Sequence, residues 1–260
     1  MALPRVLVLR SPGANCDEET EHAFRLAGAA VDRLHVNRLI EAPALLADYQ
    51  VLCIPGGFSY GDDIAAGRVL ANLVLARLPD ALRAFRDADK LMLGVCNGFQ
   101  VLLKTGILEA EDQAGPLATL TWNDHGRFEA RWSYLAADAS RCVFLRDMDR
   151  VEMPIAHAEG KIAVRDDAAL AKLAAGGRIV LRYAAPGEAA TDELLPFPAN
   201  PNGSAANAAG LCDSTGRVLG LMPHPERFVD ATQHPRWTRE PVEQPGAGLR
   251  VFRNAVEYFA

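Results

Sequence analysis

A cysteine set between two glycines is the strongest chemical signal in the sequence. Cys96 lies in the segment GVCNG, between the apolar runs KLMLGV (90–95) and GFQVLLKTG (98–106). A sharp turn between a strand and a helix lifts such a side chain clear of the sheet, and flanking glycines avoid backbone clashes. The dipole at a helix N-terminus also favours the thiolate. The pattern predicts a nucleophile, and a buried structural cysteine at a tight turn is the alternative.

A cysteine nucleophile needs a base, and the base needs a group that orients it. His224 and Glu226 follow the apolar run VLGLM (218–222) in the segment PHPER. Residues two apart on an extended segment point to the same side, so Glu226 can hold His224. In isolation this pattern is more typical of a surface turn with an incidental histidine. Together with Cys96, in this chain order, it favours a catalytic triad.

A glycine-rich segment follows the apolar run QVLCI (50–54). The segment PGGFSYG (55–61) lets the backbone approach a ligand closely. A backbone N–H of this segment, with that of Asn97, could form an oxyanion hole. A phosphate cradle is a second interpretation, although the Lys-Ser/Thr of a P-loop is missing, and a plain strand–helix turn is the third.

Three other groups offer competing chemistry. His157 stands near Glu159, which makes it an alternative base or a residue that shapes the substrate or a partner surface. A non-catalytic histidine is equally consistent with the pattern. Cys16 stands at a predicted helix start, but no glycines frame it. The two acids at 62–63 could hold a cation, although acids at a helix start more often cap the helix.

The elements that must position these residues alternate between strands and helices in the first half of the chain. The predicted strands are 5–10, 31–36, 50–54 and 90–95, and the predicted helices are 17–27, 62–78 and 98–106. This alternation predicts an α/β fold with a mostly parallel central sheet and helices on both faces. The second half should add antiparallel strands to the same sheet or its edge, with a helix at 167–175, a long loop at 184–209, a strand at 218–222 and a final helix at 247–258. We expect one domain over 1–260, with an extended tail at about 229–260.

Composition excludes several classes of function. The 260 residues are 50% hydrophobic and 23% charged, with a net charge of −6 and no basic run, so we expect neither nucleic acid nor a membrane as a partner. The five cysteines are odd in number and include no CxxC pair, which argues against a disulfide framework and structural zinc and favours the cytoplasm. No P-loop and no GxGxxG motif is present, so we expect no nucleotide, metal or other cofactor on this chain.

Three of these segments, in this order, resemble a known family. GGFSYGDD (56–63), GVCNGFQVL (94–102) and GLMPHPER (220–227) look like the motifs of triad (class I) glutamine amidotransferases of flavodoxin-like fold. The resemblance narrows to the glutaminase subunits of phosphoribosylformylglycinamidine synthase, the PurQ type, and runs to about residue 228. One departure is Ala158, where the family usually has glycine.

The resemblance implies a role for each matching residue. Cys96 attacks the side-chain amide of glutamine to form a γ-glutamyl thioester, and His224, oriented by Glu226, protonates the leaving ammonia and then activates water. The backbone amides of Gly57 and Asn97 stabilise the oxyanion. Substrate-binding positions are expected at Gln100, Arg127 and Phe128.

The resemblance also implies partners. The ammonia would pass to an ATP-dependent synthetase subunit (PurL type), which would hold ATP and Mg²⁺, and a small PurS-type subunit would join the complex. The chain alone should be a poor glutaminase, because hydrolysis without an acceptor wastes ammonia. Two alternatives stay open at this point: the glutaminase of another triad amidotransferase, and a non-catalytic binding subunit on the same scaffold.

Overall fold

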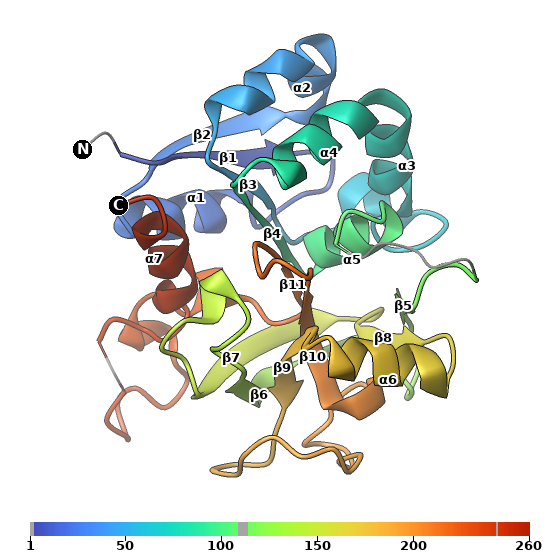
Figure 1. Cartoon of the computed structure of the whole chain (residues 1–260). Coiled ribbons are helices and arrows are strands. Elements are labelled where there is room, and N and C mark those ends of the chain that lie inside the picture. The colour runs from blue at the N-terminus through green and yellow to red at the C-terminus, as the bar shows by residue number, and fades with distance from the viewer. Residues whose placement is uncertain (1–2, 109–113, 243) are drawn as a thin grey trace.

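A central sheet organises the molecule. The computed structural model describes residues 3–108, 114–242 and 244–260. In this part of the chain one sheet holds nine strands in the order β2-β1-β3-β4-β11-β10-β9-β6-β7 (Figure 1). Its first five strands run parallel and its last four antiparallel, so the predicted mixed α/β fold is confirmed.

The parallel half carries the chemistry-bearing segments. Its strands are β1 (Arg5–Arg10), β2 (Ala30–His35), β3 (Val51–Ile54), β4 (Leu91–Val95) and β11 (Val218–Leu221). Every residue of β3, β4 and β11 is buried, as expected for apolar strands covered on both faces. Because β4 lies between β3 and β11, the loops that follow these three strands meet at one edge of the sheet.

The antiparallel half extends the sheet on the other side. Its strands are β10 (Ala208–Cys212), β9 (Ile179–Tyr183), β6 (Glu129–Ala137) and β7 (Arg150–His157). Two expectations are wrong here. The sequence does not predict the strand AAGLC of β10, because its small residues carry little strand preference. The strands β5 (Ala118–Thr121) and β8 (Lys161–Val164) pair with each other in a separate ribbon rather than joining the main sheet.

Helices cover both faces of the parallel half (Figure 1). On one face lie α1 (Asp17–Leu26) and α7 (Leu249–Glu257), and on the other lie α3 (Arg68–Arg77), α4 (Pro79–Asp87) and α5 (Asn97–Lys104). The remaining helices are α2 (Val36–Glu41) and α6 (Asp167–Ala175), with a short 3-10 helix η1 (Pro43–Asp48) after α2. No helix in the described ranges is both long and apolar enough to cross a membrane.

The helix predicted over 62–78 starts later than expected. A 3-10 turn, η2 (Ser59–Asp62), comes first, and α3 begins only at Arg68. Ile64 has a φ of 73° and is 86% exposed, so it lies outside the helix and off the core. Gly67, at φ 71°, forms the left-handed turn from which α3 starts.

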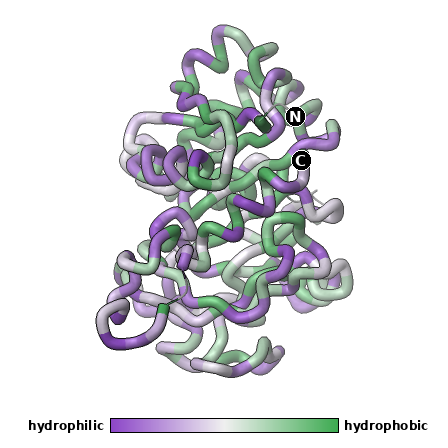
Figure 2. The backbone as a smooth tube through the Cα atoms, turned by 90° about the vertical axis from the view of Figure 1, so that its left-hand side faces the viewer, coloured by the Kyte–Doolittle hydropathy of each residue, from purple (hydrophilic) through white to green (hydrophobic). Residues whose placement is uncertain are grey.

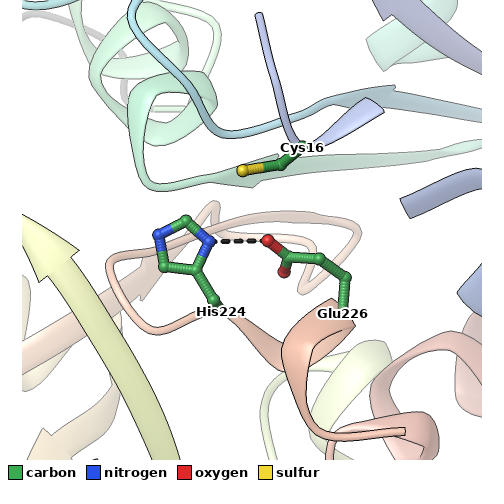
Figure 3. A group of neighbouring side chains, drawn as sticks. All are labelled: Cys16, His224 and Glu226. Carbon is green, nitrogen blue, oxygen red and sulfur yellow. Dashed lines mark hydrogen bonds and ion pairs between the residues drawn. The ribbon is translucent and has the colours of Figure 1, made fainter. Parts of the chain in front are cut away.

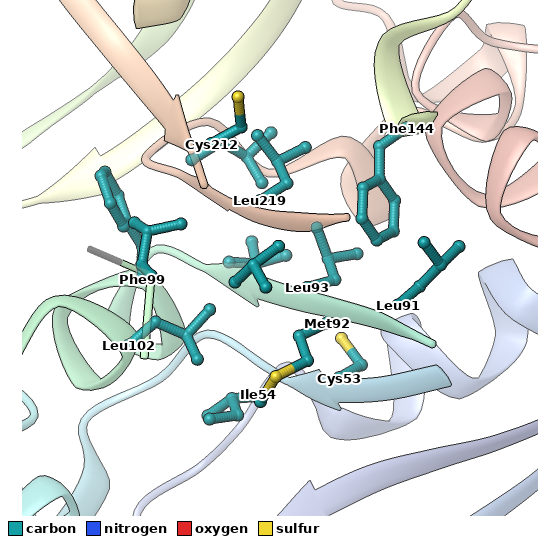
Figure 4. Packing of buried hydrophobic residues seen from close by; sticks show 14 of the residues in the cluster. Cys53, Ile54, Leu91, Met92, Leu93, Phe99, Leu102, Phe144, Cys212 and Leu219 are labelled. Carbon is teal, nitrogen blue, oxygen red and sulfur yellow. The ribbon is translucent and has the colours of Figure 1, made fainter. Parts of the chain in front are cut away.

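The core runs along the middle strands. Figure 2 shows that the strands through the middle of the molecule are mainly apolar and that polar residues gather in the outer helices and loops. Figure 4 shows side chains of β3 and β4 beneath Phe99 and Leu102 of α5 and beside Leu219 of β11. This packing fixes α5, and therefore the turn that precedes it, on the edge of the sheet.

Candidate active site

The predicted nucleophile stands on a strained turn between β4 and α5. Cys96 has φ 49° and ψ −103°, a backbone conformation that residues other than glycine rarely adopt. Such a strained conformation persists where the surrounding packing holds it, often at functional sites. Its backbone N–H donates to the carbonyl of Leu221 at 2.7 Å, which joins the turn to the end of β11. The residue is only 5% exposed, and its thiol faces the carbonyl oxygen of Ala156 at 3.7 Å.

Glycines allow α5 to sit directly on the sheet. A Cβ at Gly98 would lie 1.9 Å from the carbonyl oxygen of Ile54, and a Cβ at Gly220 would lie 2.0 Å from the ring of Phe99. Real Cβ atoms do not approach so closely, so any side chain at these positions would push α5 away. The flanking glycine of the Cys96 motif therefore has the role predicted for it, which is close packing of helix on strand.

The predicted base and its orienting group are in contact. His224 Nδ1 and Glu226 Oε1 are 2.6 Å apart, and both side chains are buried (Figure 3). Because a carboxylate only accepts, Nδ1 carries the proton that it donates. The backbone N–H of His224 donates to the carbonyl of Pro154 at 2.8 Å, which anchors the loop after β11 to β7. His224 Nε2 has no hydrogen-bond partner among the described residues, so it is available to a thiol and a substrate.

The electrostatic surroundings favour a charged imidazole. Burial by itself lowers the pKa of His224, but the Glu226 carboxylate raises it, and the neighbouring Cys96 and Cys16 thiols raise it further. The result is a pKa well above the ordinary histidine value. A charged imidazole can give a proton to a leaving group, which is the role of a general acid.

The two predicted oxyanion residues lie on two segments that meet beside Cys96. Asn97 is the first residue of α5, directly after Cys96, and Gly57 lines the same cavity as Cys96. Gly57 has a φ of 139°, and a Cβ there would lie 2.7 Å from the backbone nitrogen of Asn15, so only glycine fits. The Asn97 side chain accepts a hydrogen bond from the Ser59 amide at 3.2 Å and so ties the glycine-rich loop to the nucleophile turn.

The cavity beside Cys96 is small. Its volume is about 40 Å³. It is lined by residues of the glycine-rich loop, the nucleophile turn and the end of β7: Gly57, Phe58, Asp62, Ala66, Cys96, Gln100, Ala156, His157, Ala158 and Glu159. Larger cavities, of about 290 Å³ between η1 and α4 and about 550 Å³ beside α7, are lined by neither cysteine nor histidine. Cys96, Gly57 and Gln100 therefore share the small cavity, whereas His224 and Glu226 are not among its lining residues.

Gln100 lies in this cavity wall, but both ends of its amide are engaged. Its Nε2 donates to the carbonyl of Glu159 at 2.7 Å, and its Oε1 accepts from Asn97 Nδ2 at 2.9 Å. Asn97 Nδ2 also donates to Asp62 at 2.8 Å, and the Glu159 carboxylate accepts from the Ala66 amide at 3.2 Å. Gln100 thus joins α5 to the Glu159 loop, and Asn97 and Glu159 extend these bonds to the segment at 62–66.

The structure does not bring Arg127 and Phe128 into the wall of this cavity. Phe128 is half exposed, and its ring lies 6.4 Å from that of Phe58, which does line the cavity. The carbonyl of Arg127 accepts from Asn123 Nδ2 at 2.9 Å. Phe128 therefore stands beside a residue of the cavity wall without being part of that wall.

Sequence reasoning did not predict that Cys16 and Asn123 lie against the site, although it considered Cys16 as a possible nucleophile. Cys16 points toward the His224 ring (Figure 3), and Arg227 donates to its sulfur at 3.1 Å. Burial raises the pKa of the Cys16 thiol, with a smaller contribution from Glu226. Asn123 contacts His157 from a loop that is distant in sequence. No spacing pattern links either residue to the triad, because the contacts form only when the loops pack.

One group in the described part of the chain has the composition of a metal site. Cys16, His224 and Glu226 each offer a ligand atom, and these atoms lie within 4.8 Å of one another. The histidine and the carboxylate are already hydrogen-bonded to each other, and the Arg227 cation lies on the sulfur. The arrangement fits an oriented catalytic histidine better than a prepared metal centre.

Comparison with known proteins gives the same class of protein that the geometry of the site indicates. Residues 3–259 match the family described as the CobB/CobQ-like glutamine amidotransferase domain. The chain is 45% identical to the phosphoribosylformylglycinamidine synthase subunit PurQ of Dehalococcoides mccartyi, covering 99% of this chain and 98% of that protein. It is 39% identical to the PurQ subunit of Methanococcus maripaludis strain C7, with the same coverage. The chain belongs to the glutamine amidotransferase family.

Solved structures of glutamine amidotransferases superpose on this chain. A chain of the PurLQS structure from Thermotoga maritima superposes with a TM-score of 0.74 at 28% identity, with complete coverage of both chains. A glutamine amidotransferase from Methylobacillus flagellatus superposes with a TM-score of 0.55 at 15% identity, covering 100% of this chain and 94% of that one, which shows a shared fold.

Proposed function

We propose that this chain is the glutaminase subunit of a phosphoribosylformylglycinamidine synthase. It hydrolyses glutamine to glutamate and supplies ammonia to a synthetase in purine biosynthesis. The observation that carries the proposal is the buried His224–Glu226 pair, with 2.6 Å between Nδ1 and Oε1, beside Cys96 on its strained turn. Relatives named as the PurQ subunit of phosphoribosylformylglycinamidine synthase match over nearly the whole chain.

The reaction follows from the charges at the site. The Cys96 thiolate attacks the side-chain carbonyl carbon of glutamine, and the amides of Gly57 and Asn97 hold the oxyanion. His224 gives a proton from Nε2 to the leaving nitrogen, ammonia departs, and a thioester remains. His224 then accepts a proton from water, which attacks the thioester and releases glutamate. Glu226 keeps the imidazole in one orientation and balances its positive charge.

The likeness to a named subunit of a larger enzyme supports a partner-dependent activity. We infer that a PurL-type synthetase, with a small PurS-type subunit, opens or completes the site, and that ATP and Mg²⁺ bind on the synthetase. The superposition on a chain of the PurLQS structure supports this assembly. Five free cysteines are consistent with a cytoplasmic location.

The proposal is tested by Cys96→Ala in the complex with its synthetase. We expect glutamine-dependent product to vanish, while product made from added ammonium salt persists, because the synthetase half is untouched. Cys212→Ala, a buried cysteine on β10, is the matched control and should retain glutamine-dependent activity. Glutamine-dependent synthesis by Cys96→Ala would show that the nucleophile is assigned wrongly. Loss of the ammonia-dependent reaction as well would point to a binding-only role.

A further inference from the structure

His157 is a buried histidine that the triad does not use. It ends β7, is 3% exposed, and lines the same cavity as Cys96. The residue before it, Ala156, supplies the carbonyl that faces the Cys96 sulfur at 3.7 Å. The histidine therefore stands in the wall against which a substrate carbonyl must be placed for attack.

The hydrogen bonds around Asn123 determine the tautomer of His157. One end of the Asn123 amide contacts two carbonyl oxygens, those of Arg127 at 2.9 Å and His157 at 2.8 Å, so this end must be the NH₂ group. The other end is therefore the oxygen, which accepts from the Gly160 amide at 3.2 Å and faces His157 Nδ1 at 3.1 Å. An oxygen cannot donate, so Nδ1 carries the proton and Nε2 carries a lone pair.

The lone pair on Nε2 is unused. Nε2 is buried and has no hydrogen-bond partner in the described part of the chain. The opposite edge of the ring is covered: a Cβ at Gly160 would lie 2.2 Å from both Nδ1 and Cε1. Burial, and then the charge of nearby His224, lowers the pKa of His157 to about 3, so the ring stays neutral at physiological pH. A buried acceptor without a partner in a ligand cavity indicates a donor on the ligand.

We propose that Nε2 of His157 accepts a hydrogen bond from the carboxamide NH₂ of bound glutamine and thereby selects glutamine over glutamate. The inference rests on the proposed glutaminase function. The neighbouring Ala156 carbonyl touches the attacking sulfur, so the substrate group closest to His157 is the one that is attacked. The α-ammonium group is the other donor on glutamine, but the Asp62 and Glu159 carboxylates in the same cavity wall suit a cation better than a neutral ring does.

The selectivity follows from donor and acceptor counting. The γ-carboxylate of glutamate has no hydrogen to donate at neutral pH, so its oxygen would face the lone pair of Nε2 and leave both groups unsatisfied. A pocket built to receive an N–H rejects a ligand that lacks it. The same mismatch helps the product glutamate to leave after hydrolysis.

Two substitutions separate the proposed role from a structural one. In His157→Asn, the side-chain NH₂ can take the place of Nδ1 and keep the bond to Asn123, while the acceptor at Nε2 is lost. In His157→Gln, the longer side chain can place its oxygen where Nε2 was. Both variants are measured in the assembled complex with glutamine and with the γ-methyl ester of glutamate, which has the same reacting carbonyl but no NH₂.

We expect His157→Asn to lower kcat/KM for glutamine roughly 10- to 100-fold and to leave kcat/KM for the ester unchanged or higher. His157→Gln should recover part of the loss with glutamine. Inhibition by glutamate should become stronger, relative to glutamine binding, in His157→Asn. Equal losses with glutamine and ester would overturn the inference while leaving the glutaminase function intact. A wild-type complex that hydrolyses neither substrate would refute the function itself.

The tautomer can also be tested without any substitution. Nitrogen-15 NMR of the histidine-labelled wild-type chain should show His157 as the neutral Nδ1–H form. Addition of glutamine to a chain with Cys96→Ala, in the complex, should shift the Nε2 resonance toward that of a hydrogen-bonded acceptor. A protonated Nε2 in the free protein would refute the proposal, whether or not the variants fold.

Discussion

The charge on Glu226 has a larger consequence than its position alone. Its carboxylate is the main group that raises the pKa of His224 against the effect of burial. The pair is fully enclosed, so no water screens the interaction. Glu226 thus favours the charged form of the imidazole next to Cys96.

Replacing this carboxylate with the neutral amide should therefore impair chemistry. Glu226→Gln is expected to lower kcat for glutamine hydrolysis in the complex by roughly 10²- to 10⁴-fold. The pKa of His224 should fall, and the acidic limb of the pH–rate profile should change accordingly. Glu18→Gln is the control, since Glu18 lies on α1 and is an exposed ion-pair partner of Arg33. Activity within a few-fold of wild type in Glu226→Gln would remove Glu226 from the triad.

At the scale of elements, the nucleophile is positioned by contact of α5 with β3. Gly98 is the closest point of this contact, because its Cα faces the carbonyl of Ile54 with no room for a methyl group. The strained backbone of Cys96 depends on α5 being held there. Stability and activity should therefore be lost together when this contact is opened.

Gly98→Ala tests this dependence. We expect the free energy of unfolding to fall by about 1–3 kcal/mol and glutamine hydrolysis to fall at temperatures where the variant is still folded. Urea unfolding followed by circular dichroism gives the first quantity, and the assay of the complex gives the second. Gly28→Ala is the matched control: no atom lies near its Cβ, and only its φ of 95° opposes the substitution. If α5 can shift without effect on Cys96, Gly98→Ala will keep full activity.

The elements also show what the sequence can and cannot predict. Apolar runs and their helical neighbours predict the parallel strands and α5, because burial on both faces leaves a clear signal. The strand β10 escapes prediction because AAGLC is made of small residues. The late start of α3 escapes it because the apolar spacing continues to Ile64, while a turn ending at Gly67 interrupts the helix.

The residues of the candidate site also divide into those that the sequence predicts and those that it does not. Cys96, His224 and Glu226 are predictable because each follows an apolar strand in a short motif. The bond from Asn123 to His157 is not, since it joins the loop before β6 to the end of β7 and depends on how those loops pack. Arg127 and Phe128 are assigned by resemblance, and neither is among the residues that line the cavity.

At the scale of the whole molecule, the buried histidines of the site make the free energy of unfolding depend on pH. The pKa of His157 is about 3 in the folded protein, against an ordinary value near 6.5 in the unfolded chain. Between these values the unfolded chain binds the extra proton, so the free energy of unfolding falls as the pH falls. His224 has the opposite sign: its raised pKa stabilises the fold below about pH 6.5 and loses this effect as the pH rises through the folded value.

Comparing wild type with His157→Asn isolates the first contribution. Wild type should lose up to about 1.4 kcal/mol of unfolding free energy per pH unit through this group between about pH 6 and pH 4. The variant lacks the group, so its stability should fall less steeply over this range. Urea unfolding at a series of pH values measures both slopes, and His224 is common to both proteins. Parallel curves would mean that His157 titrates normally in the folded state.

The packing of α1 against α7 joins the early and late parts of the chain. The rings of Phe24 and Phe252 meet edge to face at 4.9 Å, and Arg227 reaches back to the sulfur of Cys16. During synthesis, the ribosome makes Cys96 long before His224, and α7 later still. A nascent chain thus holds the nucleophile without its base until the segment after β11 has also emerged and folded.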